Sequence, residues 1–192
     1  VTPERVGGLL LTGGSSRRMG RDKASLAFDH LTLAEHAAAV LTAVCSPCVE
    51  IGPGRSPLPS IQEVPPGAGP LAALAAGGHA LRIEFQYQGP VVVLACDMPS
   101  VTPELLALIA AAETEDSVIP EAEGRLQPLC ARYSPTALAT ADRLVESGER
   151  SMQSLLAAVP FRRLAEADWA GVARPDAFRD LDSPDDLATL DP

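Results

Sequence analysis

The chain has 192 residues, 46% of them hydrophobic, and a formal net charge of −10. This length and composition suit one domain with a substantial core. We find no apolar run near the ~20 residues that span a bilayer and no secretory leader, so we expect a cytoplasmic protein without a membrane partner. The acidic charge and the lack of a lysine/arginine stripe argue against nucleic acid as a partner, but not against a small phosphate anion.

A glycine-rich and basic stretch, Thr12–Lys23, follows the first predicted strand, Val6–Leu11. Glycine lets the backbone approach a ligand closely, and successive N–H groups in such a turn form a nest for anions. The glycine spacing matches neither the Walker pattern nor the dinucleotide pattern G-x-G-x-x-G. The stretch therefore predicts a phosphate-binding loop of another kind. Its positive charges come from Arg17, Arg18, Arg21 and Lys23.

The same stretch resembles the signature L-x-G-G-x-S-x-R-M-G-x-D-K of molybdenum cofactor guanylyltransferases and related nucleotidyltransferases. Thr12 stands where that family usually has alanine, and the other fixed positions agree. The resemblance implies that the loop holds a nucleoside triphosphate and that Arg18 and Lys23 stabilise charge on the departing pyrophosphate. The nucleotide contacts that it implies here are Leu11, Thr12, Gly13, Gly14, Ser16, Arg18, Gly20 and Lys23.

An alanine-rich helix is predicted from Thr32 to about Val44, because Thr32 and Glu35 form a capping box. Cys45 and Cys48 follow it as a C-x-x-C pair. A zinc site wants a second close pair, and a redox pair sits at a helix N-terminus, whereas this pair falls at a helix end. We therefore expect all four cysteines to be reduced and without a metal or redox role.

Two short strands are predicted over 49–51 and 61–64, with a proline- and glycine-rich loop over 52–59 between them. The family that the first loop resembles has a guanine-contacting aspartate just before its second glycine loop. This chain has Glu63 there, and a carboxylate can accept hydrogen bonds from guanine N1–H and the 2-amino group.

A second glycine- and proline-rich stretch, 65–74, leads into a helix of small residues that begins near Pro70. Small side chains allow close packing or a close ligand. The resembled family carries a G-P-L-A run at this place, beside the nucleotide base. The resemblance therefore implies nucleotide contacts from Gly69, Pro70 and Leu71.

The most strand-like segment, Val91–Ala95, is apolar on both faces, as a central parallel strand is. Asp97 follows it, at the sheet edge where ligands of open α/β sheets bind, and its carboxylate is a suitable Mg²⁺ ligand. Thr102 and Pro103 already cap the next helix, so Asp97 is not needed as a cap. The resemblance assigns the family's catalytic, metal-binding aspartate to Asp97.

The remaining elements are expected to alternate to the end of the chain. Two segments resemble the family further: the first, around Gln127 and Pro128, implies contacts with the acceptor substrate. The second, 178–187, resembles a closing strand and helix and brings Asp182 toward the acceptor, although its family counterpart is often asparagine. The other predicted elements are helices over 103–112, 135–147 and 151–158, strands over 117–120 and 161–164, and an irregular segment over 167–176 in which Trp169 packs.

Strands alternate with helices throughout, which predicts an α/β fold with three layers (α/β/α), Rossmann-like and doubly wound, with a mostly parallel sheet. The resemblance covers nearly the whole chain and implies a single nucleotidyltransferase domain over 1–192, like that of nucleotide-diphospho-sugar transferases.

The resemblance implies Mg²⁺-dependent transfer of GMP from GTP to the terminal phosphate of molybdopterin, with release of pyrophosphate. Because that phosphate is itself a nucleophile, the reaction needs no Ser-His-Asp triad, and positioning and charge neutralisation suffice. The Gly13-Gly14 pair favours the guanylyl branch. The resemblance further implies transient contact with molybdoenzymes or other cofactor-synthesis proteins. A cytidylyltransferase or sugar-phosphate nucleotidyltransferase, or a non-catalytic nucleotide-binding module, remains an alternative.

Overall fold

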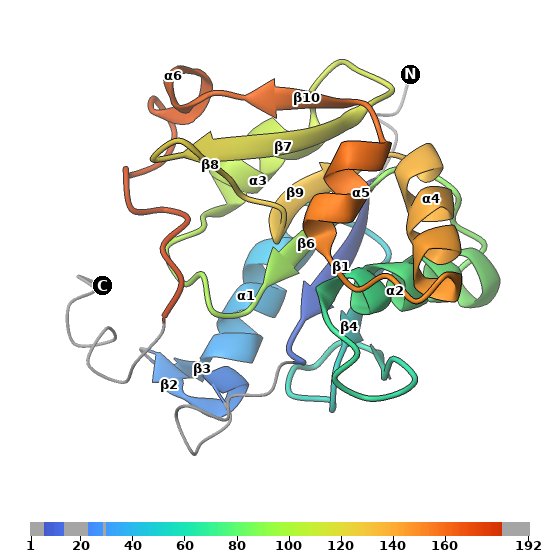
Figure 1. Cartoon of the computed structure of the whole chain (residues 1–192). Coiled ribbons are helices and arrows are strands. Elements are labelled where there is room, and N and C mark those ends of the chain that lie inside the picture. The colour runs from blue at the N-terminus through green and yellow to red at the C-terminus, as the bar shows by residue number, and fades with distance from the viewer. Residues whose placement is uncertain (1–5, 14–22, 29, 182–192) are drawn as a thin grey trace.

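Strands and helices alternate along the chain in the computed structural model, which describes residues 6–13, 23–28 and 30–181 (Figure 1). The strands are β1 (Gly7–Leu11), β2 (Ala27–Phe28), β3 (Leu31–Thr32), β4 (Cys48–Ile51), β5 (Ser60–Ile61), β6 (Val91–Ala95), β7 (Ser117–Ala122), β8 (Arg125–Leu126), β9 (Cys130–Tyr133) and β10 (Phe161–Leu164). The helices are α1 (Leu33–Thr42), α2 (Pro70–Glu84), α3 (Pro103–Ala110), α4 (Pro135–Glu146), α5 (Met152–Ala158) and α6 (Glu166–Trp169), with a 3₁₀ turn η1 (Lys23–Ser25).

The described residues form an eight-stranded sheet with the order β10-β7-β9-β6-β1-β4-β5, and β8 pairs with β7 beside this path. β1 is parallel to both of its neighbours, β4 and β6, and the pairs β4–β5 and β7–β10 are parallel as well. β9 runs antiparallel to β6 and β7, and β8 runs antiparallel to β7. The sheet is therefore mixed and mostly parallel.

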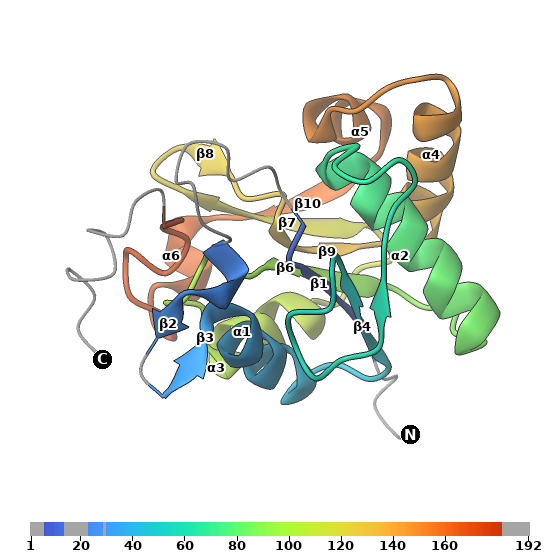
Figure 2. The ribbon, with the colours of Figure 1, turned by 90° about the horizontal axis from the view of Figure 1, so that it is seen from below.

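Side chains alternate between the two faces of the sheet, and each face carries its own apolar core. Leu10 packs into one core, with residues of α1 and α3, whereas Leu9 and Leu11 pack into the other, with residues of α2, α4 and α5. Figure 2 shows these two groups of helices on opposite sides of the sheet. The predicted three-layer, Rossmann-like fold is confirmed.

Helix α2 approaches the sheet closely because its middle carries glycine. A Cβ built on Gly77 would lie 2.6 Å from Cδ1 of Leu9 and 3.1 Å from Cδ1 of Ile51. At the next position, a Cβ on Gly78 would lie 3.3 Å from the nearest side chain, that of Leu138 on α4. Gly77 therefore sets how near α2 can lie to β1 and β4.

The prediction of a closing strand from Phe178 is wrong within the described residues, where 178–181 is irregular. Phe178 and Leu181 are buried while Arg179 and Asp180 are exposed, a spacing that a strand with its period of two does not produce. The segment is held instead by packing, since the Phe178 ring meets Trp169 edge-on at 5.1 Å between centroids.

Three smaller differences concern element bounds. The strand predicted over 61–64 is the shorter β5, and the segment around Gln127 forms a turn between β8 and β9 instead of one strand. Within 167–176, the first residues belong to α6, and Trp169 packs fully buried, as expected. The predicted capping box of α1 is confirmed, because Thr32 and Glu35 exchange both hydrogen bonds.

The strand order reverses at β1. The chain runs from β1 through α1, on one face of the sheet, to β4, and then through α2, on the other face, to β6 on the opposite flank of β1. The register pairs Leu11 with both Ile51 and Ala95, so the residues that follow these three strands meet at one edge. Such a switch point is where open α/β sheets bind ligands. Among the described residues, no helix combines the length and apolar character needed to cross a bilayer.

Candidate nucleotide-binding site

A cavity of about 310 Å³ opens at the carboxyl ends of β1 and β6, at this switch point. Its wall combines small residues with one cation and two carboxylates, which suits a ligand that carries both a polar base and phosphates. The lining residues are Leu11, Thr12, Gly13, Lys23, Ala24, Glu63, Gly67, Gly69, Pro70, Ala73, Ala95, Cys96, Asp97 and Leu129.

Asp97 is fixed at the end of β6 by its backbone. The N–H of Cys96 donates to the carbonyl oxygen of Leu11 at 3.1 Å, which extends the β1–β6 ladder by one residue. The carbonyl oxygen of Asp97 accepts from Leu181 N–H at 2.9 Å, so the chain crosses this loop and holds it. The Asp97 carboxylate lies 4.0 Å from Nζ of Lys23, and both side chains are partly exposed. The loop therefore presents the carboxylate and the ammonium group together.

The loop after Asp97 has a second anchor. Nε2 of His36, on α1, lies 3.1 Å from the carbonyl oxygen of Pro99, and the ring also meets Phe28 edge-on at 4.8 Å. His36 thus joins three segments: α1, the β2–β3 hairpin, and the loop that carries Asp97. This side chain acts as a structural support for the loop.

The N-terminus of α2 faces the same cavity. Gly69 precedes the helix with a φ of 101°, a conformation that favours glycine, and Pro70 occupies the first helical position. Gly69 has no side chain with which to cap the first-turn N–H groups, and Gly69, Pro70 and Ala73 line the cavity. These N–H groups and the helix dipole favour an anionic or acceptor-rich ligand at this end.

Glu63 lies in the wall between the first glycine loop and α2. Its side chain is buried, and Oε1 accepts from Gly67 N–H at 2.8 Å. A Cβ built on Gly13 would lie 3.7 Å from Oε1 and 3.9 Å from Oε2, so Gly13 and the Glu63 carboxylate are close neighbours. The carboxylate keeps acceptor capacity beyond the bond from Gly67, since a carboxylate has about four lone-pair sites.

The sequence analysis missed Glu50, which supports the same wall from behind. Glu50 is fully buried in β4 and accepts hydrogen bonds from the hydroxyls of Thr12 and Ser56 and from the N–H groups of Gly54, Arg55 and Ser56. Burial alone would raise the pKa of its carboxyl, but these hydrogen bonds outweigh burial and hold the pKa below its usual range. A glutamate inside the apolar run Cys48–Ile51 was the signal available in the sequence.

A second cavity, of about 640 Å³, adjoins the first. Leu129 lines both, and Met98, which lines the second, directly follows Asp97. Gln127 and Pro128 line it, as do charged side chains of both signs. The full lining is Met98, Ala122, Glu123, Arg125, Leu126, Gln127, Pro128, Leu129, Pro175, Asp176, Phe178, Arg179 and Asp180.

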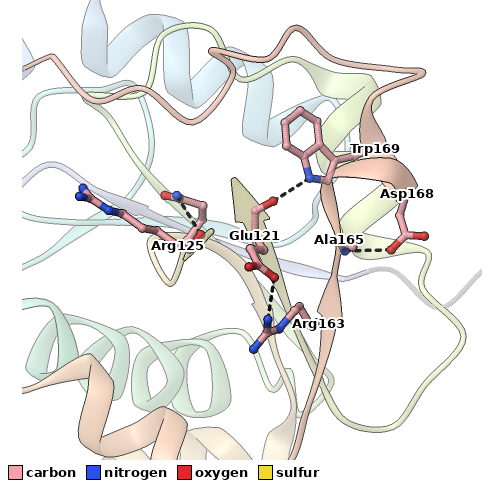
Figure 3. A network of polar contacts seen from close by, with 7 residues as sticks. Glu121, Arg125, Arg163, Ala165, Asp168 and Trp169 are labelled. Atoms are coloured by element: carbon pink, nitrogen blue, oxygen red, sulfur yellow. Dashed lines mark hydrogen bonds and ion pairs between the residues drawn. The ribbon is translucent and has the colours of Figure 1, made fainter. Parts of the chain in front are cut away.

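The β7–β8 hairpin that forms one wall of this second cavity is braced from outside. The Glu121 carboxylate accepts from Nη1 of Arg163 on β10 at 2.8 Å, and its backbone carbonyl accepts from Nε1 of Trp169 at 3.1 Å (Figure 3). Figure 3 also shows Arg125 extending away from this network. The Arg125 side chain takes no part in these contacts of Glu121 and lines the second cavity.

The predicted site residues divide into three groups. One group shares the first cavity: Leu11, Thr12, Gly13, Lys23, Glu63, Gly69, Pro70 and Asp97. Leu71 is the exception, because it is fully buried in the core and lines neither cavity. Gln127 and Pro128 lie apart from that cavity, in the second one. The third group lies outside the described residues: Gly14, Ser16, Arg18, Gly20 and Asp182.

Neither metal clusters nor disulfides occur in the part of the chain that the structure describes, where no three His, Cys, Asp or Glu side chains gather as a metal site. All four cysteines are free thiols in the structure. Burial raises the pKa of Cys45 to about 12 and that of Cys48 to about 11. Thiols that stay protonated at neutral pH are poor nucleophiles, so the C-x-x-C pair lacks the chemistry of a redox motif.

The fold and the cavity place the chain among the Rossmann-like α/β proteins that bind a nucleotide at the strand ends. A domain model described as "MobA-like NTP transferase domain" matches residues 8–167. The chain therefore belongs to the MobA-like NTP transferase family, and it is an enzyme of the nucleotidyltransferase class.

Curated relatives from Mycobacterium tuberculosis and Mycobacterium bovis, each called a probable molybdenum cofactor guanylyltransferase, are 36% identical over 184 aligned positions, with 88% of each chain covered. A relative of the same name from Mycobacterium marinum is 34% identical over 93% of this chain and 92% of its own. The crystal structure of molybdopterin-guanine dinucleotide biosynthesis protein A from Archaeoglobus fulgidus is similar, with a TM-score of 0.77, 26% identity and 96% of both chains covered.

Proposed function

We propose that this nucleotidyltransferase transfers GMP from GTP to the terminal phosphate of molybdopterin and releases pyrophosphate. The observation that carries the proposal is the pair of adjoining cavities, which meet at Leu129 beside Asp97. Two substrates that react with each other need two compartments with a common border. The names of the mycobacterial and archaeal relatives, which mention a guanylyltransferase and molybdopterin-guanine dinucleotide biosynthesis, support this choice of substrates.

In this proposal the nucleotide lies in the first cavity, with its base toward Glu63 and its phosphates toward Lys23 and Asp97. The Glu63 carboxylate accepts from guanine N1–H and the 2-amino group, a pair of donors that cytosine does not offer on one edge. The glycine-rich loop also contributes Gly14, Ser16, Arg18 and Gly20, which lie outside the described residues. The acceptor lies in the second cavity, against Gln127 and Pro128, and Asp182 is proposed to complete its contacts.

The reaction needs positioning more than acid–base chemistry. A phosphate oxygen of the acceptor attacks the α-phosphorus of the nucleotide, the new P–O bond forms, and the bond to the bridging oxygen of the pyrophosphate breaks. Lys23, in the lining of the first cavity, is proposed to stabilise the charge that grows on the leaving group, and Arg18 is proposed to share that role. Held phosphates and fixed cations lower the barrier without a protein nucleophile.

The donors at Asp97 fit Mg²⁺. This ion prefers oxygen ligands and takes one or two carboxylates together with substrate phosphates, and Asp97 presents a partly exposed carboxylate in the cavity wall. When bound there, Mg²⁺ supplies positive charge to the phosphate oxygens. Nζ of Lys23 lies 4.0 Å from Oδ2 of Asp97 and pairs with this carboxylate.

Calorimetric titration of the purified chain with GTP and with CTP, each with and without Mg²⁺, tests the choice of nucleotide. We expect tighter binding of GTP than of CTP, and tighter binding with Mg²⁺ than without it. Equal binding or a preference for CTP would leave the nucleotidyltransferase class intact but overturn the guanylyl assignment. An activity assay then tests the acceptor. Mass spectrometry detects the conversion of molybdopterin to its guanine dinucleotide, and the release of pyrophosphate is measured alongside.

Asp97→Asn and Lys23→Ala test the charged pair. We expect Asp97→Asn to abolish transfer, because it weakens the proposed Mg²⁺ site, and Lys23→Ala to lower kcat/KM by about a hundredfold or more, because it removes positive charge from the reacting phosphates. Asp142→Asn on α4, a carboxylate paired with Arg82 that lines neither cavity, is the matched control and retains full turnover. Wild-type turnover in Asp97→Asn, with the fold intact by circular dichroism, would remove the metal role.

A further inference from the structure

We infer that Glu50 is a positioning residue for nucleotide binding, which acts through Thr12 and Gly13 without touching the ligand. The inference rests on the proposed function, because it concerns the same cavity. Glu50 is a fully buried carboxylate that the proposed reaction does not use. Burying a charge is costly unless hydrogen bonds satisfy it, so a buried carboxylate in a strand needs a reason.

Glu50 gathers its donors from two segments that are far apart in the sequence. One oxygen, Oε1, accepts from the Thr12 hydroxyl at the end of β1 and from Gly54 N–H at 2.9 Å. The other, Oε2, accepts from the N–H and the hydroxyl of Ser56, each at 2.7 Å. Arg55 N–H lies between them, 2.8 Å from Oε1 and 3.0 Å from Oε2. The carboxylate therefore ties the turn after β4 to the first residue of the glycine-rich loop.

The backbone reinforces this tie. The N–H groups of Thr12 and Gly13 both donate to the carbonyl oxygen of Ile51, at 3.2 and 3.3 Å. Gly52 packs directly behind them, since a Cβ at Gly52 would lie 2.9 Å from the nitrogen of Gly13 and would collide with Oγ1 of Thr12. The start of the glycine-rich loop is thus held against β4 by three neighbouring residues, Glu50, Ile51 and Gly52.

Thr12 and Gly13 stand between two carboxylates. On their far side lies Glu50, away from the cavity, and on their near side lies Glu63, which lines it together with Thr12 and Gly13. Glu50 is negatively charged and accepts only, so the Thr12 hydroxyl must point its proton away from the cavity. A shift of Thr12 would move Gly13 against Glu63 and narrow the space for the ligand. Glu50 therefore sets the shape of the wall that the nucleotide meets.

The test compares Glu50→Gln with the wild-type chain in steady-state transfer and in calorimetric binding of Mg²⁺–GTP. Glutamine has nearly the size of glutamate, but its NH₂ group is itself a donor. On one side it therefore faces N–H donors with which it forms no hydrogen bond. We expect KM and Kd for GTP to rise about tenfold, the equivalent of one lost hydrogen bond to a charged group, while kcat stays within about twofold. KM rises while kcat stays nearly constant because the variant loses the same binding free energy in the ground state and in the transition state.

Arg132→Met is the matched control for a merely structural role. Arg132 is the positively charged counterpart of Glu50, because it is buried in β9 and its guanidinium donates to backbone carbonyls at the end of α3 and in the loop that follows. These carbonyls belong to Ala110, Ala112, Thr114 and Asp116, which line neither cavity. Both variants lower the unfolding midpoint, and only Glu50→Gln raises KM for GTP. Equal KM values in Glu50→Gln and wild type would overturn the inference.

A double-mutant cycle tests the route through Thr12. If Glu50 acts through the Thr12 hydroxyl, Glu50→Gln raises KM much less in a Thr12→Val background than in the wild type. Additive effects would contradict the inference. Should Glu50→Gln not fold, Ser56→Ala in its place removes one donor to the same carboxylate. A wild-type chain that binds no GTP would instead overturn the proposed function.

Discussion

At the scale of single residues, the site depends on a few positions where no larger side chain fits. Gly52 is the clearest. Its φ of 155° is one that residues with a Cβ rarely adopt, and the space that a Cβ would need is filled by Thr12 and Gly13. The wall of the first cavity is therefore supported by a glycine that does not line the cavity itself.

We expect Gly52→Ala to lower the free energy of unfolding by about 3 kcal/mol, because backbone strain and overpacking each cost roughly 1–3 kcal/mol. Urea denaturation measures the change. Gly124→Ala is the control: Gly124 also has a positive φ, of 72°, but nothing lies within 4 Å of its Cβ position. Its cost is the strain alone, about 1 kcal/mol. Equal losses in the two variants would show that contact with Thr12 contributes nothing.

At the scale of elements, α2 and β1 are matched to each other. The helix carries Gly77 against Leu9 and Ile51, and its N-terminus reaches the cavity through Gly69 and Pro70. The depth at which α2 packs on the sheet therefore also sets where its first turn lies relative to Asp97 and Lys23. A change in how α2 packs in the core would therefore also change the geometry of the site.

Two adjacent substitutions separate packing from helix propensity. Alanine is favoured over glycine by about 1 kcal/mol in a helix interior, so both Gly77→Ala and Gly78→Ala gain that amount. At Gly77 the new Cβ falls 2.6 Å from Leu9, and overpacking of about 1–3 kcal/mol outweighs the gain. At Gly78 the nearest contact is 3.3 Å, with Leu138. We expect thermal unfolding to show Gly77→Ala as the less stable of the two, and the reverse order would refute the packing argument.

At the scale of the whole molecule, stability is bounded on the acid side by carboxylates and on the alkaline side by buried thiols. In the folded chain the pKa of Glu50 lies below its ordinary value of 4.5, so the stability it contributes is complete above that value and is lost as pH falls through the folded pKa. Burial raises the pKa of Cys45 from 9.0 to about 12 and also raises that of Tyr133, so stability falls as pH rises above about 9.

Urea midpoints measured between pH 3 and pH 11 should therefore trace a plateau with two falling limbs. Glu50→Gln flattens the acid limb, because the amide does not titrate, although the plateau itself is lower. Cys45→Ala flattens the alkaline limb in part, since Tyr133 and the other buried thiols remain. An acid limb of unchanged slope in Glu50→Gln would mean that other carboxylates carry the acid sensitivity.

Much of this molecule could be predicted from its sequence because the signals were local. Alternating apolar strands and capped helices predicted the three layers, and the run Val91–Ala95 followed by Asp97 predicted a carboxylate at the sheet edge. Glu50 was missed because its partners come from two distant segments, a pairing that only the fold creates. The closing strand was expected from the family resemblance alone and is wrong within the described residues, where Phe178 is held by its ring contact with Trp169 and Leu181 by a hydrogen bond to Asp97.

The position of β1 has a consequence for how the chain is made. β1 comes first in the sequence, yet both of its neighbours are synthesised later, β4 ending at Ile51 and β6 at Ala95. At ribosomal rates of 5–20 residues per second, the second neighbour emerges on the order of ten seconds after β1. During that time the apolar stretch Gly7–Leu11 is without a complete place in a sheet. The nascent chain thus completes the sheet edge that carries the first cavity only after β6 has emerged, and chaperones have that interval in which to bind the exposed strand β1.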